Sequence, residues 1–483
     1  METQIWSACL GLLVFVYLLA KTLQRRKLNL PPGPKPWPVI GNLNLIGSLP
    51  HKSLHELAQK YGPLIHLQFG SCPVVVGSSA EMAKVILKTM DVNFSCRPQT
   101  AAGKYTTYNY SDMTWSPYGP YLKQARKMCL TELFSAKRLE SYEYIRVEEI
   151  NSMIKKPVQS LGSTRFAEGI YVHSDPERDQ PHGSGEEVPG QRQRERGGFA
   201  GGVQENAGRA DLSERGDQRG GCDSLAQFLG FAGARRKSVE GYVSRDMVDV
   251  LLEQAEDPTL EVKMERHNVK ALTQDLLAGG TESSAVTVEW AMSEILKKPK
   301  ILKKATEELD RVIGQNKWVQ EKDMSNLPYI EAIVKETMRL HPVAPLLMPR
   351  RTREDCKVAG YDIKKGTQVF VNTWTIGTDP SLWENPTEFN PERFIENAID
   401  AKGHHFEFLP FGSGRRMCPA YSLGMKVIQS SLANLLHGFN WKLPNRMQPE
   451  DLNMDEVFGL SCPRKIPLVA VVEPRLPPEV YNL

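Results

Sequence analysis

Hydrophobic residues recur at helical spacing through much of the C-terminal half of the chain, and shorter apolar runs lie before and between these stretches. The spacing predicts helices over residues 267–296, 299–312 and 328–340, with Pro342 stopping the last, and over 80–90. The short runs predict strands at 66–69, 74–76 and 369–371. We find no internal repeat. This pattern predicts one large, mainly α-helical domain with a minor β-sheet region, an α+β arrangement.

The N-terminal segment, residues 1–30, predicts a membrane anchor. Residues 5–20 are almost wholly apolar and Lys21, Arg25, Arg26 and Lys27 follow them, whereas no basic residue precedes them. A cleaved signal peptide, the rival interpretation, needs a basic start and a small-residue cleavage site. Positive charge after the span predicts a single N-terminal anchor with the rest of the chain in the cytosol. The prolines of residues 31–42 then predict a stiff hinge between the anchor and the domain.

A change of composition divides the domain into an N-terminal part, residues 43–156, and a second part, residues 237–483. The segment between them, 157–236, contains no lysine and is rich in Gly, Arg, Glu and Gln. It shows no sustained helical or strand period, and its composition is typical of disorder. We therefore expect no regular structure in this segment.

Charge and cysteine content exclude some classes of protein. A formal net charge of +3 is too small to indicate a nucleic-acid partner, and no long block of like charge occurs. The eight cysteines lie far apart, without the rhythm of a disulfide scaffold or of a zinc site, which fits a reducing compartment.

One of these cysteines stands in an unusual loop. Residues 411–418 read FGSGRRMC, so that Phe411, Gly414 and Arg416 precede Cys418. Glycines let the backbone approach a flat ligand, and nearby positive charge favours the thiolate, which is the form that binds metals. The loop predicts a thiolate ligand at Cys418. The alternative is an ordinary Gly-Arg loop with a structural cysteine.

The long helix predicted at 267–296 contains two adjacent glycines in its middle. A glycine inside a helix costs about 1 kcal/mol relative to alanine. We expect Gly279 and Gly280 to interrupt the helix and admit a small ligand, beside which the Thr281 hydroxyl and the Glu282 carboxyl relay protons. The alternative is that the glycines end one helix and Thr281 or Ser283 caps another.

Three charged residues predict a buried network. Glu336 and Arg339 share a helix face because they stand three residues apart. Arg393, in the segment FNPERF of residues 389–394, is a second arginine that can complete the group. A dry network of this kind is tolerated only when every member is satisfied.

In their order along the chain, the anchor, proline hinge, AGGTES helix, E-x-x-R helix, PERF segment and F-x-x-G-x-R-x-C loop together resemble the cytochrome P450 family. The wordings AGGTESSAVTVEW and FGSGRRMCPAYSLG are similar to its plant microsomal A-type branch, flavonoid 3′-hydroxylase-like members included. The resemblance covers residues 31 to about 156 and 247 to the end. It implies a two-lobed domain that binds haem b, iron protoporphyrin IX, with Cys418 as the iron ligand.

The resemblance also implies the roles of other residues. Arg416, Arg126 and Arg350 would meet the haem propionates, with Phe411 and Gly414 in the haem-binding loop. Thr281 and Glu282 would deliver protons to oxygen, whereas Glu336, Arg339 and Arg393 would hold the core together.

The implied activity is that of a haem-thiolate monooxygenase of the endoplasmic reticulum membrane, with its catalytic domain facing the cytosol. It would hydroxylate a small apolar or phenolic secondary metabolite, flavonoid- or terpenoid-like, using O2 and electrons from NADPH through NADPH-cytochrome P450 reductase. One alternative is a membrane-anchored haem-binding protein without catalysis. Another is an isomerase or dehydratase that needs no reductase, which Thr281 and Glu282 disfavour.

Three departures from the family pattern bear on the alternative of a haem-binding protein without catalysis. Leu122 and Lys123 stand where the family usually has Trp-Arg, and Ala420 replaces a common glycine. In addition, segment 157–236 stands where relatives have helices that roof the substrate pocket. Such a switch, with good matches on both sides, is typical of a stretch read in another frame, in the gene or its assembly. An intact, in-frame transcript with these residues would contradict the assembly explanation.

Overall fold

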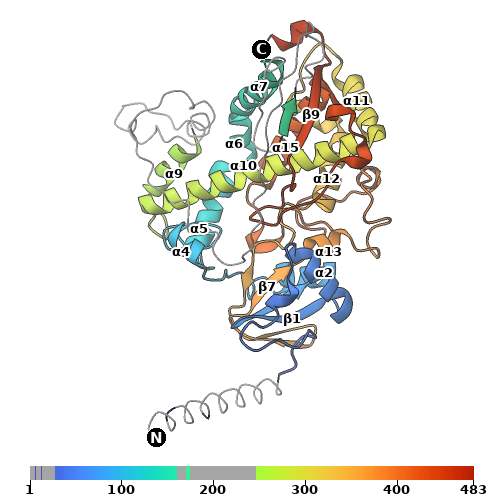
Figure 1. Ribbon diagram of the computed structural model, residues 1–483. Helices are drawn as coiled ribbons and strands as arrows, with labels where there is room; N and C mark the ends of the chain where they lie inside the picture. Colours follow the sequence, from blue (N-terminus) through green and yellow to red (C-terminus); the bar gives the residue numbers. More distant parts are fainter. Residues whose placement is uncertain (1–5, 7–11, 13–27, 160–169, 174–245, 483) are drawn as a thin grey trace.

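The computed structural model describes residues 28–159, 170–173 and 246–482, together with Trp6 and Leu12. Figure 1 shows a small lobe built around a sheet and a larger helical lobe crossed by one long helix. This confirms the predicted mainly α-helical fold with a minor sheet region. The predicted anchor and most of segment 157–236 lie outside the described residues. Within the described residues, no helix is long and apolar enough to span a membrane.

The four-stranded sheet of the small lobe is covered on both faces. Its order is β1 (Leu64–Phe69), β2 (Cys72–Gly77), β7 (Gln368–Val371) and β4 (Arg350–Arg351), with β2 and β7 parallel and the other pairs antiparallel. Because alternate side chains of a strand point to opposite faces, Ile65 and Val74 pack with Leu54 of α2 (Pro50–Tyr61). Leu64 and Val75 pack instead with Met82 of α3 (Ala80–Lys84).

The long helix α10 (Arg266–Lys297) organises the large lobe. Its C-terminal part, from Val286 to Leu296, is buried on all sides. There it packs in one hydrophobic core with α11 (Pro299–Ile313), α12 (Pro328–Leu340) and α15 (Tyr421–Gly438). Its N-terminal part packs against α5 (Pro120–Met128), the π-helical turn η3 (Cys129–Leu133) and α9 (Met247–Ala255). Burial on all sides explains why its apolar residues continue through several turns.

Two expectations about local structure were wrong. The helix around Gly279 and Gly280 is not interrupted, because α10 runs continuously from 266 to 297. The expectation of no regular structure in segment 157–236 was also wrong. The helix α7 (Glu143–Gln159) includes the first residues of this segment, and the strand β3 (Ile170–His173) within it pairs parallel with β9 (Leu468–Pro474). The strand β3 is too short to show a period, and its partner β9 lies near the C-terminal end of the chain.

The remaining elements are short. They are the helices α4 (Ala101–Tyr105), α6 (Ala136–Ser141), α13 (Thr373–Gly377) and α14 (Glu392–Ile395), the strands β5 (Cys356–Val358), β6 (Tyr361–Ile363) and β8 (Phe439–Lys442), the π-helical turn η2 (Val85–Thr89), and the 3-10 turns η1 (Leu43–Leu45), η6 (Glu321–Asn326), η7 (Gly414–Arg416), η8 (Pro444–Arg446), η9 (Pro449–Asp451) and η10 (Pro478–Tyr481).

Candidate functional site

The loop 411–418 turns tightly before α15 and presents Cys418. Gly412 and Gly414 have φ angles of +68° and +71°, a region that L side chains rarely adopt. A Cβ atom at Gly414 would lie 1.9 Å from the carbonyl oxygen of Leu87, so that only glycine fits there. The Cys418 N–H donates to the Phe411 carbonyl over 3.0 Å, which closes the loop. Gly414 therefore permits close approach to the backbone of Leu87, whereas the predicted approach of this loop to a flat ligand stays a prediction.

The charge around the Cys418 sulfur differs from the sequence expectation. Burial raises the pKa of the Cys418 thiol, and the Ala420 N–H and Arg126 oppose that effect only in part. The two arginines that precede the cysteine turn elsewhere: Arg415 pairs with Asp91 at 3.0 Å, and Arg416 donates to backbone carbonyls. Among the cations of the described residues, Arg126 is therefore the one that favours the thiolate at this sulfur, and a bound metal ion would favour it further.

Four arginines gather beside this loop. Arg126 Nη2 donates to the Met417 carbonyl at 2.8 Å, and Arg350 reaches the Phe94 and Ser413 carbonyls at 3.4 and 3.2 Å. Arg416 bonds the carbonyls of Ser95, Met113 and Ser116 at 2.5–3.0 Å. The fourth is Arg97, whose donors reach the carbonyls of Thr114, Met348 and Pro349 at 2.8–3.0 Å. The sequence reasoning missed Arg97, because no motif of charge or spacing surrounds it.

The electrostatics of this arginine cluster (Arg97, Arg126, Arg350 and Arg416) favour an anion. In the described part of the chain, none of the four forms an ion pair with a carboxylate. Burial, and then repulsion from its guanidinium neighbours, lowers the pKa of Arg97 well below its usual range. Burial likewise lowers the pKa of Arg350 to about 9 and that of Arg416 to about 10. Buried cations that bond only to neutral carbonyl groups remain costly, so this cluster suits a ligand with carboxylate or phosphate groups.

The middle of α10 offers open space and two hydroxyl groups. A Cβ at Gly279 or Gly280 would meet nothing within 4 Å. The Thr281 hydroxyl donates to the Leu277 carbonyl at 2.6 Å, and the Ser283 hydroxyl donates to that of Gly279 at 2.7 Å. These hydroxyls bond within the helix, so a proton relay through either needs its hydroxyl to turn first. Ser283, which we expected only as a possible cap, therefore has the same local geometry as Thr281.

Glu282 is tied to the C-terminal part of the chain. The Ser461 hydroxyl donates to Glu282 Oε1. The next residue, Cys462, offers its carbonyl to Trp290 Nε1 at 2.9 Å, so the loop is fastened to α10 at two points. Ser461 escaped the sequence reasoning because 179 residues separate it from Glu282.

The structure brings Glu336, Arg339 and Arg393 together. Arg339 holds the Glu336 carboxylate through two bonds of 2.7 and 2.8 Å, and Arg393 Nε reaches it at 3.0 Å. The Asn390 N–H adds a bond of 2.8 Å to the same carboxylate. The Arg339 Nη1 donates to the carbonyls of Gly377 and Pro386, and Glu336 is fully buried. This network therefore has the completeness that a dry ion group needs.

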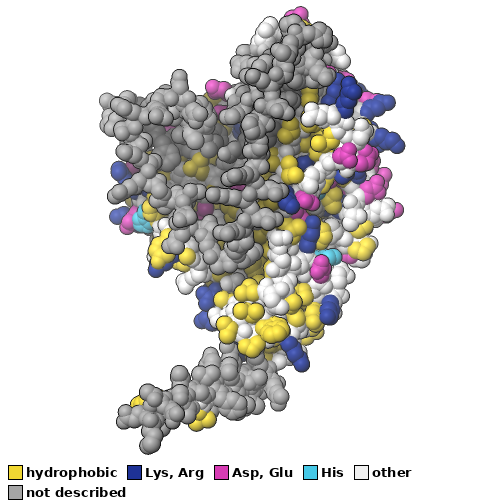
Figure 2. Space-filling view, viewed as in Figure 1, with side chains coloured by type: hydrophobic (Ala, Val, Ile, Leu, Met, Phe, Trp, Pro, Cys, Tyr) yellow, Lys and Arg dark blue, Asp and Glu magenta, His cyan; other side chains and the backbone are white. Residues whose placement is uncertain are grey.

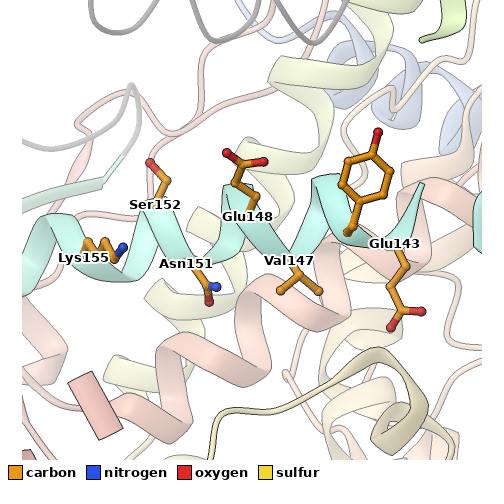
Figure 3. A pocket seen from close by; sticks show the side chains of 7 residues that line it. Glu143, Val147, Glu148, Asn151, Ser152 and Lys155 are labelled. Atoms are coloured by element: carbon orange, nitrogen blue, oxygen red, sulfur yellow. The ribbon is translucent and has the colours of Figure 1, made fainter. Parts of the chain in front are cut away.

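A separate pocket of about 700 Å³ lies on the outer face of α7 (Figure 3). Its described lining comes from this one helix: Glu143, Tyr144, Val147, Glu148, Asn151, Ser152 and Lys155. No predicted site residue lines it. Because one helix supplies its whole described wall, the pocket shows no convergent chemical groups.

Comparisons with known proteins place these features in a family. The model of the family described as "Cytochrome P450" matches residues 31–165 and 222–469. The chain is 42% identical to "Trimethyltridecatetraene synthase" of maize (Zea mays), in an alignment that covers 99% of this chain and 95% of the maize protein. It is 38% identical to "Flavonoid 3'-monooxygenase" of Petunia hybrida, in an alignment that covers 99% of each chain. A solved zebra fish cytochrome P450 with abiraterone matches with a TM-score of 0.67 at 21% identity, covering 89% of this chain and 100% of that one.

The same comparisons refine the boundaries of the central segment. We expected the family match to stop near residue 156 and resume at 247, but it extends to 165 and resumes at 222. The alignment to the maize protein spans 533 positions against 483 residues here, so at least 50 positions (533 − 483) of that alignment have no residue from this chain. The unmatched part is therefore narrower than predicted.

Proposed function

Because this chain belongs to the cytochrome P450 family and is a monooxygenase of that family, we propose that it oxidises a small apolar or phenolic secondary metabolite of terpenoid or flavonoid type. The names of two relatives support both classes, since one makes a tetraene and the other oxygenates a flavonoid. The identity to the maize tetraene synthase, 42%, exceeds that to the flavonoid enzyme, 38%, so terpenoid-like substrates deserve equal place in a screen.

Family membership implies a haem-thiolate cofactor, and the residues present fit it. The observation that carries the proposal is the arginine cluster beside a lone thiol. Three buried guanidinium groups and the half-buried Arg126, none of them ion-paired with a carboxylate in the described residues, suit the two haem propionates. In this proposal Cys418 is the iron ligand, Phe411 and Gly414 shape its loop, and the arginine cluster binds the propionates. Haem, when bound, supplies the redox centre that activates O2 with electrons from NADPH through a reductase.

We assign proton delivery to the middle of α10. Glu282 is the acid, and the hydroxyls of Thr281 and Ser283 lie on either side of it in sequence. The Ser461 hydroxyl holds the Glu282 carboxyl in one orientation. Glu336, Arg339 and Arg393 have a structural role in this proposal, because each is occupied by the others and by backbone groups.

The surface near Cys418 suits an acidic docking partner such as NADPH-cytochrome P450 reductase. Lys123, Arg353 and Arg415 surround the ring of Tyr118 at 5.5–6.0 Å. These side chains are exposed, and Lys127 lies one turn further along the chain. Complementary charge of this kind steers association and depends on ionic strength.

Attachment to the endoplasmic reticulum membrane, with the domain in the cytosol, has support beyond segment 1–30. The hinge and the turn that follows it expose apolar side chains, namely Trp37, Val39 and Ile40 within residues 31–42 and Leu43 and Leu45 directly after them. Val39 is 91% exposed at a φ angle of +66°, an uncommon conformation for a β-branched residue. Figure 2 shows hydrophobic side chains gathered on the small lobe, at the end of the molecule where the described chain begins. Such a surface suits contact with lipid.

A second candidate function is haem binding without catalysis. It is favoured by one observation, namely that the family model leaves residues 166–221 unmatched, so that this chain departs there from the family pattern. In that case the haem site would form but no turnover would follow.

The first test is the carbon monoxide difference spectrum of the reduced full chain, expressed in microsomes. We expect the red-shifted Soret band of thiolate ligation, and its loss in Cys418→Ala with protein present. Absence of the band from the unsubstituted chain would contradict the haem-thiolate assignment. NADPH-dependent oxidation in a screen of terpenoids and flavonoids then separates the two candidates, because haem retention without any turnover would support the second.

A further inference from the structure

Two carboxyl groups meet between α10 and the turn of residues 112–116, which we call the B turn. Asp275 Oδ2 on α10 accepts the N–H groups of Met113 and Thr114 at 2.8 and 3.0 Å. Asp112 is fully buried and accepts the Trp115 N–H at 3.1 Å. The two carboxyl groups are close neighbours, because Asp275 holds the N–H of Met113, the residue directly after Asp112. Two carboxyl groups placed side by side repel each other when both are charged, which favours a proton on one of them.

The B turn lies between this carboxyl pair and the arginine cluster. Its Met113 and Ser116 carbonyls accept bonds from Arg416 at 3.0 and 2.5 Å, and its Thr114 carbonyl accepts one from Arg97 at 3.0 Å. Amides of the turn thus bond to α10 while its carbonyls bond to two arginines. The position of the turn therefore sets the position of those guanidinium groups.

The chain directly before the B turn is strained. Tyr108, Asn109 and Tyr110 have φ angles of +51°, +58° and +62°, three successive left-handed residues without a glycine. Such a conformation persists only where surrounding contacts hold it. Tyr121 of α5 supplies one such contact, because its hydroxyl donates to the Ser111 carbonyl. The carboxyl pair supplies the next, one residue further on.

We propose that Asp112 and Asp275 share one proton and act as positioning residues, a proton-dependent latch that docks the B turn on α10 and so fixes Arg97 and Arg416. The consequence for the cofactor rests on the proposed haem-binding role of these arginines. The latch itself does not, because its contacts are all within the protein.

The groups facing the pair set its pH range. They are Tyr121 on α5, Cys129 on η3, and the cations Arg97 and Arg416. Burial, and then the Asp275 charge, raises the pKa of Asp112 to about 7. Burial also raises the pKa of Asp275, although the N–H groups of Met113 and Thr114 oppose this.

The sign of the pH effect follows from these shifts. Asp112 has a higher pKa in the docked state than its ordinary value of 3.8, so the docked state binds the proton more tightly. Docking is therefore strongest below the ordinary pKa, weakens as the pH rises toward 7, and is constant above that. Between pH 6 and pH 8 the docking equilibrium constant should fall about tenfold.

Amide hydrogen exchange in the haem-loaded full chain tests the latch. We expect the protection of residues 113–116, corrected for the intrinsic effect of pH on exchange, to fall about tenfold from pH 6 to pH 8. In Asp112→Asn the amide donates to Asp275 without a titrating proton, so protection should persist and lose its pH dependence. The carbon monoxide spectrum of each variant reports that it has folded.

Glu308→Gln is the matched control. Glu308 is also a buried carboxyl with a raised pKa, and it accepts the N–H groups of Tyr329 and Ile330, but it lies between α11 and α12. Its substitution should leave the pH slope at 113–116 unchanged. The latch would be overturned if the protection of residues 113–116 had the same pH dependence in wild type and in Asp112→Asn, or no pH dependence in wild type. Failure of the chain to bind haem would contradict the proposed function instead, and the exchange measurement on the haem-free chain would still decide the latch.

Discussion

Two groups of buried arginines in this protein have opposite arrangements. Arg339 and Arg393 surround the Glu336 carboxylate, and every charged atom there has a partner within the chain. The arginine cluster of Arg97, Arg126, Arg350 and Arg416 has only backbone carbonyls as partners in the described residues, and the guanidinium groups repel one another. Both groups are buried, so the desolvation cost applies to both.

The difference separates a structural site from a binding site. A complete network gains nothing from a ligand, and removing a member leaves a buried charge without a partner. An incomplete cluster of one sign is stabilised when an anion arrives, and the free protein gains when a member is removed. Substitutions in the two groups should therefore differ in which property they change, folding or cofactor retention.

The largest effect is expected from Glu336→Ala. The substitution leaves Arg339 and Arg393 buried without their carboxylate, which should cost about 3–5 kcal/mol of unfolding free energy. Urea unfolding followed by tryptophan fluorescence measures this loss. Glu331→Ala is the control, because Glu331 lies on the same helix but pairs with Lys335 at the surface, where a loss below about 1 kcal/mol is expected. Similar losses for the two variants would show that the network is not the structural site that we infer.

Arg350→Met should show the reverse pattern. Arg350 has long bonds of 3.4 and 3.2 Å to its carbonyls, so little is lost from the haem-free protein, and its unfolding free energy should change by less than about 1 kcal/mol or rise. Haem binding should weaken by about 1.5–3 kcal/mol, the value of a hydrogen bond to a charged group. Haem transfer to a scavenger protein measures the second quantity.

Arg464→Met is the control for Arg350. Arg464 is also buried and bonds the carbonyls of Ile466 and Asn453, but it stands outside the arginine cluster. Its loss should lower stability without changing the rate of haem transfer. If Arg350→Met destabilised the haem-free protein as strongly and left haem transfer unchanged, the cluster would be structural.

Several parts of this structure were predictable from the sequence because their signals are local. The helices over 299–312 and 328–340 show a clear period and begin at prolines, and the structure places them within one residue of the prediction. The contact of Glu336 with Arg339 follows from helical spacing alone. In contrast, the continuity of α10 was missed because two glycines outweighed the apolar pattern around them. Buried residues further along the helix on both sides, from Asn268 to Thr273 and from Val286 to Leu296, hold it in place.

The rest depends on distant parts of the chain. Arg97 lies far from the 411–418 loop in the sequence, and only folding brings it beside Arg416 of that loop. The thiol environment was misjudged for the same reason, because the adjacent Arg415 pairs with Asp91 while the distant Arg126 faces the sulfur. The roles assigned to Cys418, Thr281 and Glu282 stay predictions, which the spectra and variants above address.

The smallest effect is expected at a carboxyl group whose contacts are less complete than those of the Glu336 network but not absent. Glu282 on α10 accepts one bond, from the Ser461 hydroxyl, and is otherwise exposed. In Ser461→Ala the carboxyl loses its fixed orientation, which should cost about 1 kcal/mol, or about fivefold in the rate of a step that uses this group. We expect a lower share of NADPH electrons in product and a higher share in hydrogen peroxide.

Ser381→Ala is the control for this last substitution, because the Ser381 hydroxyl likewise donates to a carboxylate, that of Asp379, but at the surface away from α10. In Ser381→Ala the shares of NADPH electrons that reach product and hydrogen peroxide should equal those of the wild type. A solvent deuterium isotope effect that grows in Ser461→Ala but not in Ser381→Ala would identify a proton-transfer step, which a general loss of stability would not change. If both variants kept the wild-type electron balance, Glu282 would be an ordinary partly exposed carboxyl, and the contrast between complete and incomplete sites would not extend to α10.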